Sequence, residues 1–134
     1  MNIKRLIMAI VAAYVVMSIL GMAADQLLSD FTPMMKAMGR MGPDLEAHFI
    51  WMMLGYLIVT IFFCYIYAHF HEGKGWTEGA RFGLYIGLMM AGISMVMYAV
   101  LPMSAMESLI SAITGIIIYV AGGITTSLVY KAED

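Results

Sequence analysis

Charged side chains are scarce in this sequence, and their scarcity excludes an ordinary soluble domain. Asp, Glu, Lys and Arg make up 12% of the 134 residues, whereas hydrophobic residues make up 63%. A typical soluble domain carries roughly 25% charged residues. The net charge of -2 leaves no basic footprint of the kind that binds nucleic acid. We therefore expect a membrane protein surrounded by the lipid bilayer, with no nucleic-acid partner.

Cysteine and histidine are too few for most metal or catalytic centres. The single cysteine, Cys64, allows neither an intrachain disulfide nor a CxxC metal site. His48 lies at one end of an apolar stretch and His69 and His71 at the other, so they cannot share one metal within a chain. No Ser-His-Asp, Cys-His or P-loop pattern is recognisable. The sequence therefore predicts a protein that is not an enzyme and has no resident cofactor.

Long stretches without charge are present instead. Four of them contain no Asp, Glu, Lys or Arg, and each can cross a hydrocarbon core of ~30 Å, which takes ~20 helical residues. We predict helices over about 5–27, 47–70, 79–101 and 108–130, in one domain covering residues 1–134. The predicted fold class is all-α, a bundle of four transmembrane helices.

The basic residues predict the orientation of this bundle. Over four crossings, most of them fall on the side of the two chain termini: Lys4, Arg5, Lys74, Arg81 and Lys131. Lys36 and Arg40 fall on the other side. Since cytoplasmic loops are enriched in Lys and Arg, we expect both termini in the cytoplasm. The N-terminal apolar run is longer than a usual signal core, so we interpret it as a retained first helix.

The outer loop between the first two helices contains a predicted short helix. Thr32 can cap its start, and Pro33 suits the first helical position. Methionines follow on one side at helical spacing, away from the basic residues: Met34, Met38 and Met41. We predict an amphipathic helix that lies on the outer membrane surface or caps the mouth of the bundle.

Small residues indicate which helix faces pack closely. The third helix carries one at every fourth position: Gly79, Gly83, Gly87 and Ala91. The fourth helix has a second face of this kind: Ser111, Gly115, Gly122 and Thr126. Small residues let helix backbones approach each other in lipid. The second helix is bulky and aromatic, so we expect it at the periphery or against a partner.

The segment HEGKGWTEGARFGLYIGL resembles a group of small uncharacterised bacterial four-helix membrane proteins. In that group an EGKG-type inner loop precedes an EGxR[FY]G start to the third helix. The matching residues are Glu72, Gly73, Lys74, Gly75, Glu78, Gly79, Arg81, Phe82 and Gly83. The resemblance covers roughly the second half of the chain. It implies the bacterial inner (cytoplasmic) membrane and brings no activity with it.

Helix association is the leading functional hypothesis. No ionisable carboxylate or amine lies in the middle of a predicted span, which argues against a proton-coupled pump. The absence of charge in mid-span and the presence of small-residue faces together favour a non-catalytic integral membrane protein. It would act as a small subunit of a larger membrane complex or as a homo-oligomer.

Two alternatives remain open. The sequence contains 16 methionines, and soft thioether ligands suit Cu(I), although methionine also fills irregular gaps. The candidate copper ligands are Met34, Met35, Met38, Met41 and His48. The first alternative is therefore a Cu(I)-binding or copper-delivery protein, and the second is a small oligomeric transporter or channel for a neutral solute.

Overall fold

The computed structural model describes residues 1–131, and its helices follow the order expected from the apolar stretches. They are α1 (Ile3–Leu28), the 3-10 helix η1 (Ser29–Phe31), α2 (Pro33–Met38), α3 (Gly42–His69), α4 (Trp76–Val100) and α5 (Ala105–Val129). No strand occurs within the described range. Four helical segments are long and apolar enough to cross a membrane: α1 with η1, α3, α4 and α5. The all-helical class and the four candidate spans are thus confirmed.

The start of α3 differs from the prediction. The helix begins at Gly42, whereas the sequence placed its start near residue 47 and used Gly42 and Pro43 to end the preceding short helix. Pro43 instead occupies the first turn of α3, where a residue without an N–H is tolerated. Asp44 lies in the same turn, where a carboxylate is favoured by the helix dipole. These two residues therefore extend the helix by more than a turn.

The short loop helix α2 is also smaller than its methionine pattern suggested. It ends at Met38, so Met41 lies outside it and directly precedes α3. Pro33 occupies the first turn of α2, as predicted. The predicted cap by the Thr32 side chain is wrong, because its hydroxyl donates to the Leu28 carbonyl oxygen at 3.2 Å. That carbonyl is available because α1 ends there.

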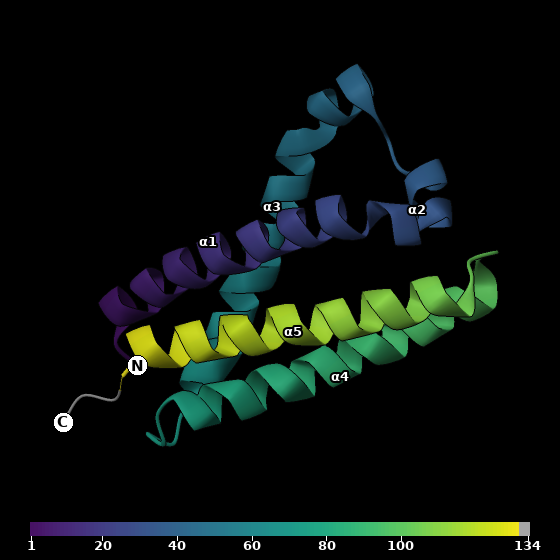
Figure 1. Cartoon of the computed structure of the whole chain (residues 1–134). Helices are drawn as coiled ribbons and strands as arrows, with labels where there is room; N and C mark the ends of the chain where they lie inside the picture. The colour runs from purple at the N-terminus through teal and green to yellow at the C-terminus, as the bar shows by residue number, and fades with distance from the viewer. Residues whose placement is uncertain (132–134) are drawn as a thin grey trace.

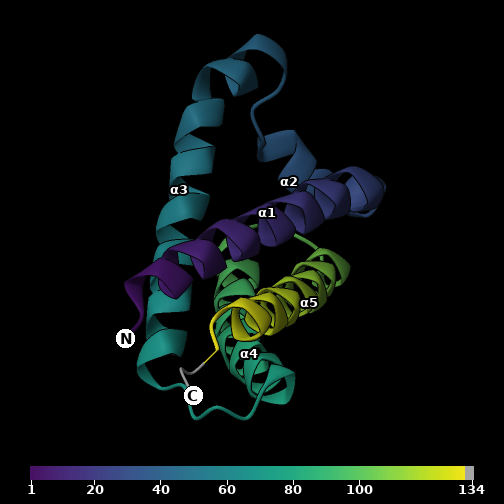
Figure 2. The same cartoon turned by 90° about the vertical axis from the view of Figure 1, so that its left-hand side faces the viewer.

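Helices α4 and α5 form a hairpin, α1 packs over it, and α3 crosses the other helices (Figures 1 and 2). Helices α4 and α5 lie antiparallel along their whole length, and α1 lies over α5 (Figure 1). Helix α3 crosses these helices steeply, and its first half stands away from them (Figure 2). The start of α1 and the end of α5 lie at the same end of the molecule (Figure 1). We call this the terminal end and the other the loop end.

The buried core lies where the second half of α3 crosses α1 and α5. Phe63 packs its ring against Phe82 of α4 at 4.8 Å and against Tyr119 of α5 at 5.8 Å, measured between ring centroids. Tyr67 adds an edge contact with Phe82 at 5.5 Å. The buried hydrophobic residues are Leu6, Ala9, Ala13, Phe63, Cys64, Tyr67 and Tyr130. The core thus occupies the half of the molecule nearer the terminal end.

Glycines bring the backbones of α4 and α5 into contact. A Cβ on Gly83 would lie 2.7 Å from the Val120 Cα, and one on Gly87 would lie 2.8 Å from the Ile116 Cα. A Cβ on Gly79 would overlap the Gly123 carbonyl oxygen. Real side chains cannot approach backbone atoms so closely. These α4 positions therefore require glycine because the neighbouring helix occupies the space of a side chain.

The face of α5 that meets α4 differs from the predicted stripe. Gly122 packs against Met17 of α1, where an added Cβ would lie 2.9 Å from the Met17 Cγ. Thr126 lies 3.4 Å from the Cys64 sulfur of α3. An added Cβ on Gly115 would meet no described atom within 4 Å, so this glycine does not serve helix packing as predicted. Gly123, rather than Gly122, meets Gly79 of α4. One residue turns a helix by about 100°, so the face that meets α4 lies beside the predicted stripe.

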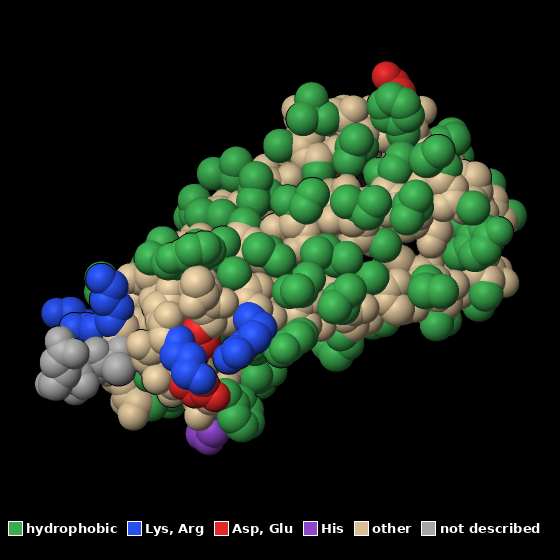
Figure 3. Space-filling view, turned by 60° about the horizontal axis from the view of Figure 1, so that its bottom comes forward, with side chains coloured by type: hydrophobic (Ala, Val, Ile, Leu, Met, Phe, Trp, Pro, Cys, Tyr) green, Lys and Arg blue, Asp and Glu red, His purple; other side chains and the backbone are tan. Residues whose placement is uncertain are grey.

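Hydrophobic side chains are spread over the body of the face shown in Figure 3. Lys and Arg side chains gather with acidic ones at one end of this face, and a further acidic side chain lies at its upper edge (Figure 3). A hydrogen bond from the Arg5 side chain to the Lys131 carbonyl oxygen, at 3.0 Å, joins the start of α1 to the residues that follow α5. An apolar body with charge concentrated at one end is the surface expected of a helical bundle in lipid.

Candidate functional site

A buried carboxylate organises the loop between α3 and α4. The Glu78 side chain is only 7% exposed, although it lies in the first turn of α4. Its Oε1 accepts the backbone N–H of Glu72 and its Oε2 accepts the backbone N–H of Lys74, both at 2.8 Å. Hydrogen bonds to a charged acceptor are roughly twice as strong as neutral ones. Glu78 therefore holds the loop against the start of the helix.

His71 extends this cluster toward α3 and α5. Its Nδ1 lies 3.2 Å from Glu78 Oε1 and 3.1 Å from the Tyr67 hydroxyl. The ring also contacts Tyr130 edge-on, with the centroids 5.5 Å apart. The His71 side chain is 8% exposed, and its Nε2 has no hydrogen-bond partner among residues 1–131. His71 is thus a packed core group that joins three helices.

This cluster was not predicted from the sequence. There His71 was considered only as a metal ligand, and Glu78 only as a residue of the EGKG-type segment. A usable signal was present, because a first-turn glutamate follows a loop with two glycines. Gly73 and Gly75 adopt positive φ values of 80° and 75°, a conformation that suits glycine and lets the loop fold back over the carboxylate.

Thr77 does not cap α4 with its side chain. The N-cap residue is Gly75, which has no side-chain cap hydrogen bond, and the Thr77 hydroxyl donates to the Lys74 carbonyl oxygen at 3.2 Å. Backbone N–H groups of the loop donate to the Glu78 carboxylate instead. Because Glu78 already accepts two backbone N–H groups and faces His71, its carboxylate is fully occupied by the fold. This arrangement supports a structural role for the pair.

A second buried glutamate performs the same task at the loop end. Glu107 lies in the first turn of α5 and is almost fully buried. Its Oε2 accepts the backbone N–H of Ser104 at 2.9 Å, and the Ser104 hydroxyl accepts the N–H of Glu107 at 3.1 Å, which completes a capping box. Its Oε1 accepts the backbone N–H of Met34 at 2.7 Å. Glu107 thereby ties α2 to the start of α5.

Replacing Ser104 with Ala should weaken this end of the hairpin modestly. The variant loses the acceptor for the Glu107 N–H, and loss of an N-cap side chain costs about 1 kcal/mol. The Glu107 bond to the Met34 N–H should persist. The free energy of unfolding in detergent measures the effect. Ser29→Ala is the matched control, because its exposed hydroxyl donates only to the Gln26 carbonyl oxygen, and an equal loss there would contradict the prediction.

The five copper candidates do not form one group. Met35 and Met41 line a cavity of about 460 Å³ together with Asp25, whereas Met34, Met38 and His48 do not line it. The Met35 sulfur accepts a hydrogen bond from the Ser111 hydroxyl at 3.3 Å.

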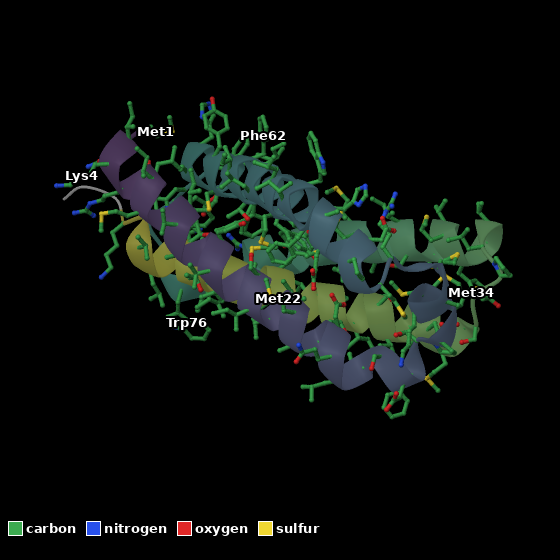
Figure 4. The ribbon with its side chains drawn as sticks, turned by 90° about the horizontal axis from the view of Figure 1, so that it is seen from above. Met1, Lys4, Met22, Met34, Phe62 and Trp76 are labelled. Atoms are coloured by element: carbon green, nitrogen blue, oxygen red, sulfur yellow. The ribbon has the colours of Figure 1, made fainter. Side chains whose placement is uncertain are left out.

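The remaining candidates lie elsewhere. His48 Nδ1 lies 2.8 Å from the Asp44 carbonyl oxygen in the part of α3 that stands away from the bundle. Met34 lies at the loop end, far from Lys4, and Met22 lies between them along α1 (Figure 4). In the described part of the chain, no three His, Cys, Asp or Glu residues are grouped as a metal site would require.

Comparison of the chain with protein-family models, with curated proteins and with solved structures found no match. The resemblance of the EGKG segment to small bacterial membrane proteins therefore stays a prediction. Functional inference depends on the geometry of the helices themselves.

Proposed function

We propose that this chain is a non-catalytic, multi-pass protein of the bacterial inner membrane that works by helix association, as a homo-oligomer or a small complex subunit. The start of α1 and the end of α5 lie together at the terminal end. Both termini would lie in the cytoplasm, because most of the basic residues belong to this side of the chain. The methionine-bearing loop helix α2 would lie on the outer side. The exposed first half of α3 is the observation that carries this proposal.

The first half of α3 makes almost no contact with its own bundle. Every buried residue of α3 lies in its second half: Thr60, Phe63, Cys64 and Tyr67. All residues from 42 to 51 are exposed. The Tyr14 hydroxyl, which donates to the Met53 carbonyl oxygen at 3.2 Å, links α1 to the midpoint of the helix. Around this link, α3 offers an exposed apolar surface inside the candidate span, formed by Phe49, Ile50, Trp51, Leu54 and Ile58.

Gly55 makes this surface suitable for another helix. No described atom lies within 4 Å of the Cβ that a larger residue would add at Gly55. Its surroundings are apolar, with Trp51 69% exposed and Ile58 also exposed. Small residues allow close helix approach in lipid, and the α4–α5 contact shows that this chain uses such approaches internally. A helix of a second copy or of a partner subunit can pack at Gly55.

Native mass spectrometry of protein extracted from its own membranes in mild detergent tests the proposal. We expect a defined oligomer or complex rather than a monomer. Gly55→Leu should weaken the assembly at least ~10-fold, equivalent to about 1.4 kcal/mol. Gly92→Leu is the matched control, because Gly92 is equally unobstructed but belongs to α4, which already packs along α5. A protein that is monomeric and brings no partner would overturn the proposal, and stoichiometric copper in the same sample would favour the methionine hypothesis.

A further inference from the structure

A small pocket with a mostly apolar lining lies between the candidate spans, where α1, α3 and α5 meet. Its volume is about 130 Å³. No charged residue lines it, but all three helices contribute a hydroxyl. The lining residues are Met17, Ser18, Gly21, Tyr56, Val59, Thr60, Gly115, Ile118 and Tyr119. Hydroxyl-bearing side chains from three helices thus border one space between the spans.

Ser18 has unused hydrogen-bonding capacity in this pocket. The residue is 8% exposed, and its buried Oγ has no hydrogen-bond partner in the part of the chain that the structure describes. Two threonine hydroxyls within the spans donate to a carbonyl oxygen of the preceding turn. Thr60 donates to the Tyr56 carbonyl oxygen and Thr126 to that of Gly122, each at 2.8 Å. Polar groups away from water require partners. Since Ser18 lines the pocket, a rotation of its side chain would bring this buried hydroxyl to a molecule bound there.

Two glycines keep the pocket open. An added Cβ on Gly115 would meet no described atom within 4 Å, and one on Gly21 would first meet the Tyr56 hydroxyl at 4.0 Å. This contrasts with Gly83 on α4, whose missing side chain leaves room for a backbone. Gly115 was predicted as a packing residue, but its open side borders the pocket. Its lack of a side chain preserves space for a ligand.

A larger cavity of about 460 Å³ lies farther toward the loop end along α1. On α1 the pocket reaches Gly21 and the cavity begins at Ala24, about one turn away. On α5 the pocket borders Gly115 and the cavity borders the adjacent Thr114. Toward the terminal end, Met17 packs on Gly122, and the core continues beyond it.

We propose that this pocket binds a small uncharged molecule that carries hydroxyl groups, of the size of a three-carbon polyol. A volume of about 130 Å³ exceeds the ~30 Å³ that one water occupies in the liquid, so the space suits more than a single water. Hydroxyl side chains both donate and accept hydrogen bonds, as a polyol requires. The uncharged lining disfavours an ion. This binding is separate from the proposed association through α3.

Methionine methyl NMR with glycerol as the probe tests this site. The full chain in detergent is labelled on its methionine methyl groups, and glycerol is titrated. We expect a saturable shift of the Met17 signal, while Met8, exposed on α1, shifts little. Ser18→Ala should weaken the apparent affinity at least ~10-fold. Gly115→Leu should abolish the saturable shift by filling the pocket, whereas Gly92→Leu should leave it unchanged.

The outcomes separate a bound ligand from a solvent effect. If Met17 does not shift, or if Met17 and Met8 shift together in proportion to glycerol, the proposal is overturned. Wild-type affinity in Gly115→Leu would overturn it as well. The remaining methionine signals report whether each variant keeps its fold. A saturable Met17 shift in a folded wild type, lost in a folded Gly115→Leu variant, supports the site.

Discussion

Gly83→Val is expected to separate α4 from α5 and to destabilise the protein by about 3 kcal/mol. A Cβ at this position would lie 2.7 Å from both the Tyr119 carbonyl carbon and the Val120 Cα. These are backbone atoms of a continuous helix, so they cannot swing aside as the end of a flexible side chain can. The helices must move apart, and the contacts on either side of Gly83 are then lost. The free energy of unfolding, measured by detergent titration with circular dichroism, tests this expectation.

Gly92→Val provides the matched control for this experiment. Gly92 lies on the same helix, but a Cβ there would meet no described atom within 4 Å. The two substitutions introduce the same residue into the same helix, so differences in helix propensity largely cancel. We expect Gly92→Val to change the free energy of unfolding by less than about 1 kcal/mol. Equal effects of the two variants would show that backbone contact is not the cause.

Glu78→Gln is expected to release the loop between α3 and α4 at a cost of about 2–3 kcal/mol. Glutamine keeps the size of the side chain, but its NH₂ group cannot accept a hydrogen bond. One of the backbone N–H groups of Glu72 and Lys74 therefore loses its acceptor, and the bond that remains is no longer charge-assisted. Hydrogen exchange at these two amides should accelerate. The free energy of unfolding should fall in the same variant.

Glu72→Gln distinguishes the buried carboxylate from the charge of the loop. The Glu72 side chain is 53% exposed and pairs with Lys74, which lowers the pKa of the Glu72 carboxyl. A lowered pKa means that this pair is formed at neutral pH and is lost as the pH falls through that pKa. Surface pairs of this kind add little to stability. We expect no measurable change in unfolding, and an effect equal to that of Glu78→Gln would refute the assigned role of Glu78.

The two buried glutamates explain how a protein with so few charges keeps its loops in place. Glu78 holds the α3–α4 loop at one end of the α4–α5 hairpin, and Glu107 holds α2 at the other. Lipid cannot supply hydrogen bonds to a backbone, so loop groups near the apolar region need partners within the protein. Each end of the α4–α5 hairpin is thus held by a buried glutamate. The first half of α3 lies outside this hairpin, and it is the surface through which we propose association.

The number and type of the helices followed from the sequence alone. Crossing a hydrocarbon core requires a minimum apolar length, and four stretches meet this requirement independently of their packing. The glycines at four-residue steps on α4 likewise indicated a face without side chains, and the structure places Gly79, Gly83 and Gly87 against α5. Length and small-residue spacing are local properties, so a linear sequence reveals them.

The tertiary structure alone decided which partner each face meets. Apolarity does not separate a lipid-facing side from a helix-facing side, since both are apolar in a membrane. On α5 the small residues therefore gave no means of assigning Gly122 to α1, Thr126 to α3 and Gly115 to a pocket. Burial of Glu78 and Glu107 depends on the paths of loops far from their own helices. These properties arise from the placement of neighbouring segments, which no single stretch of the sequence contains.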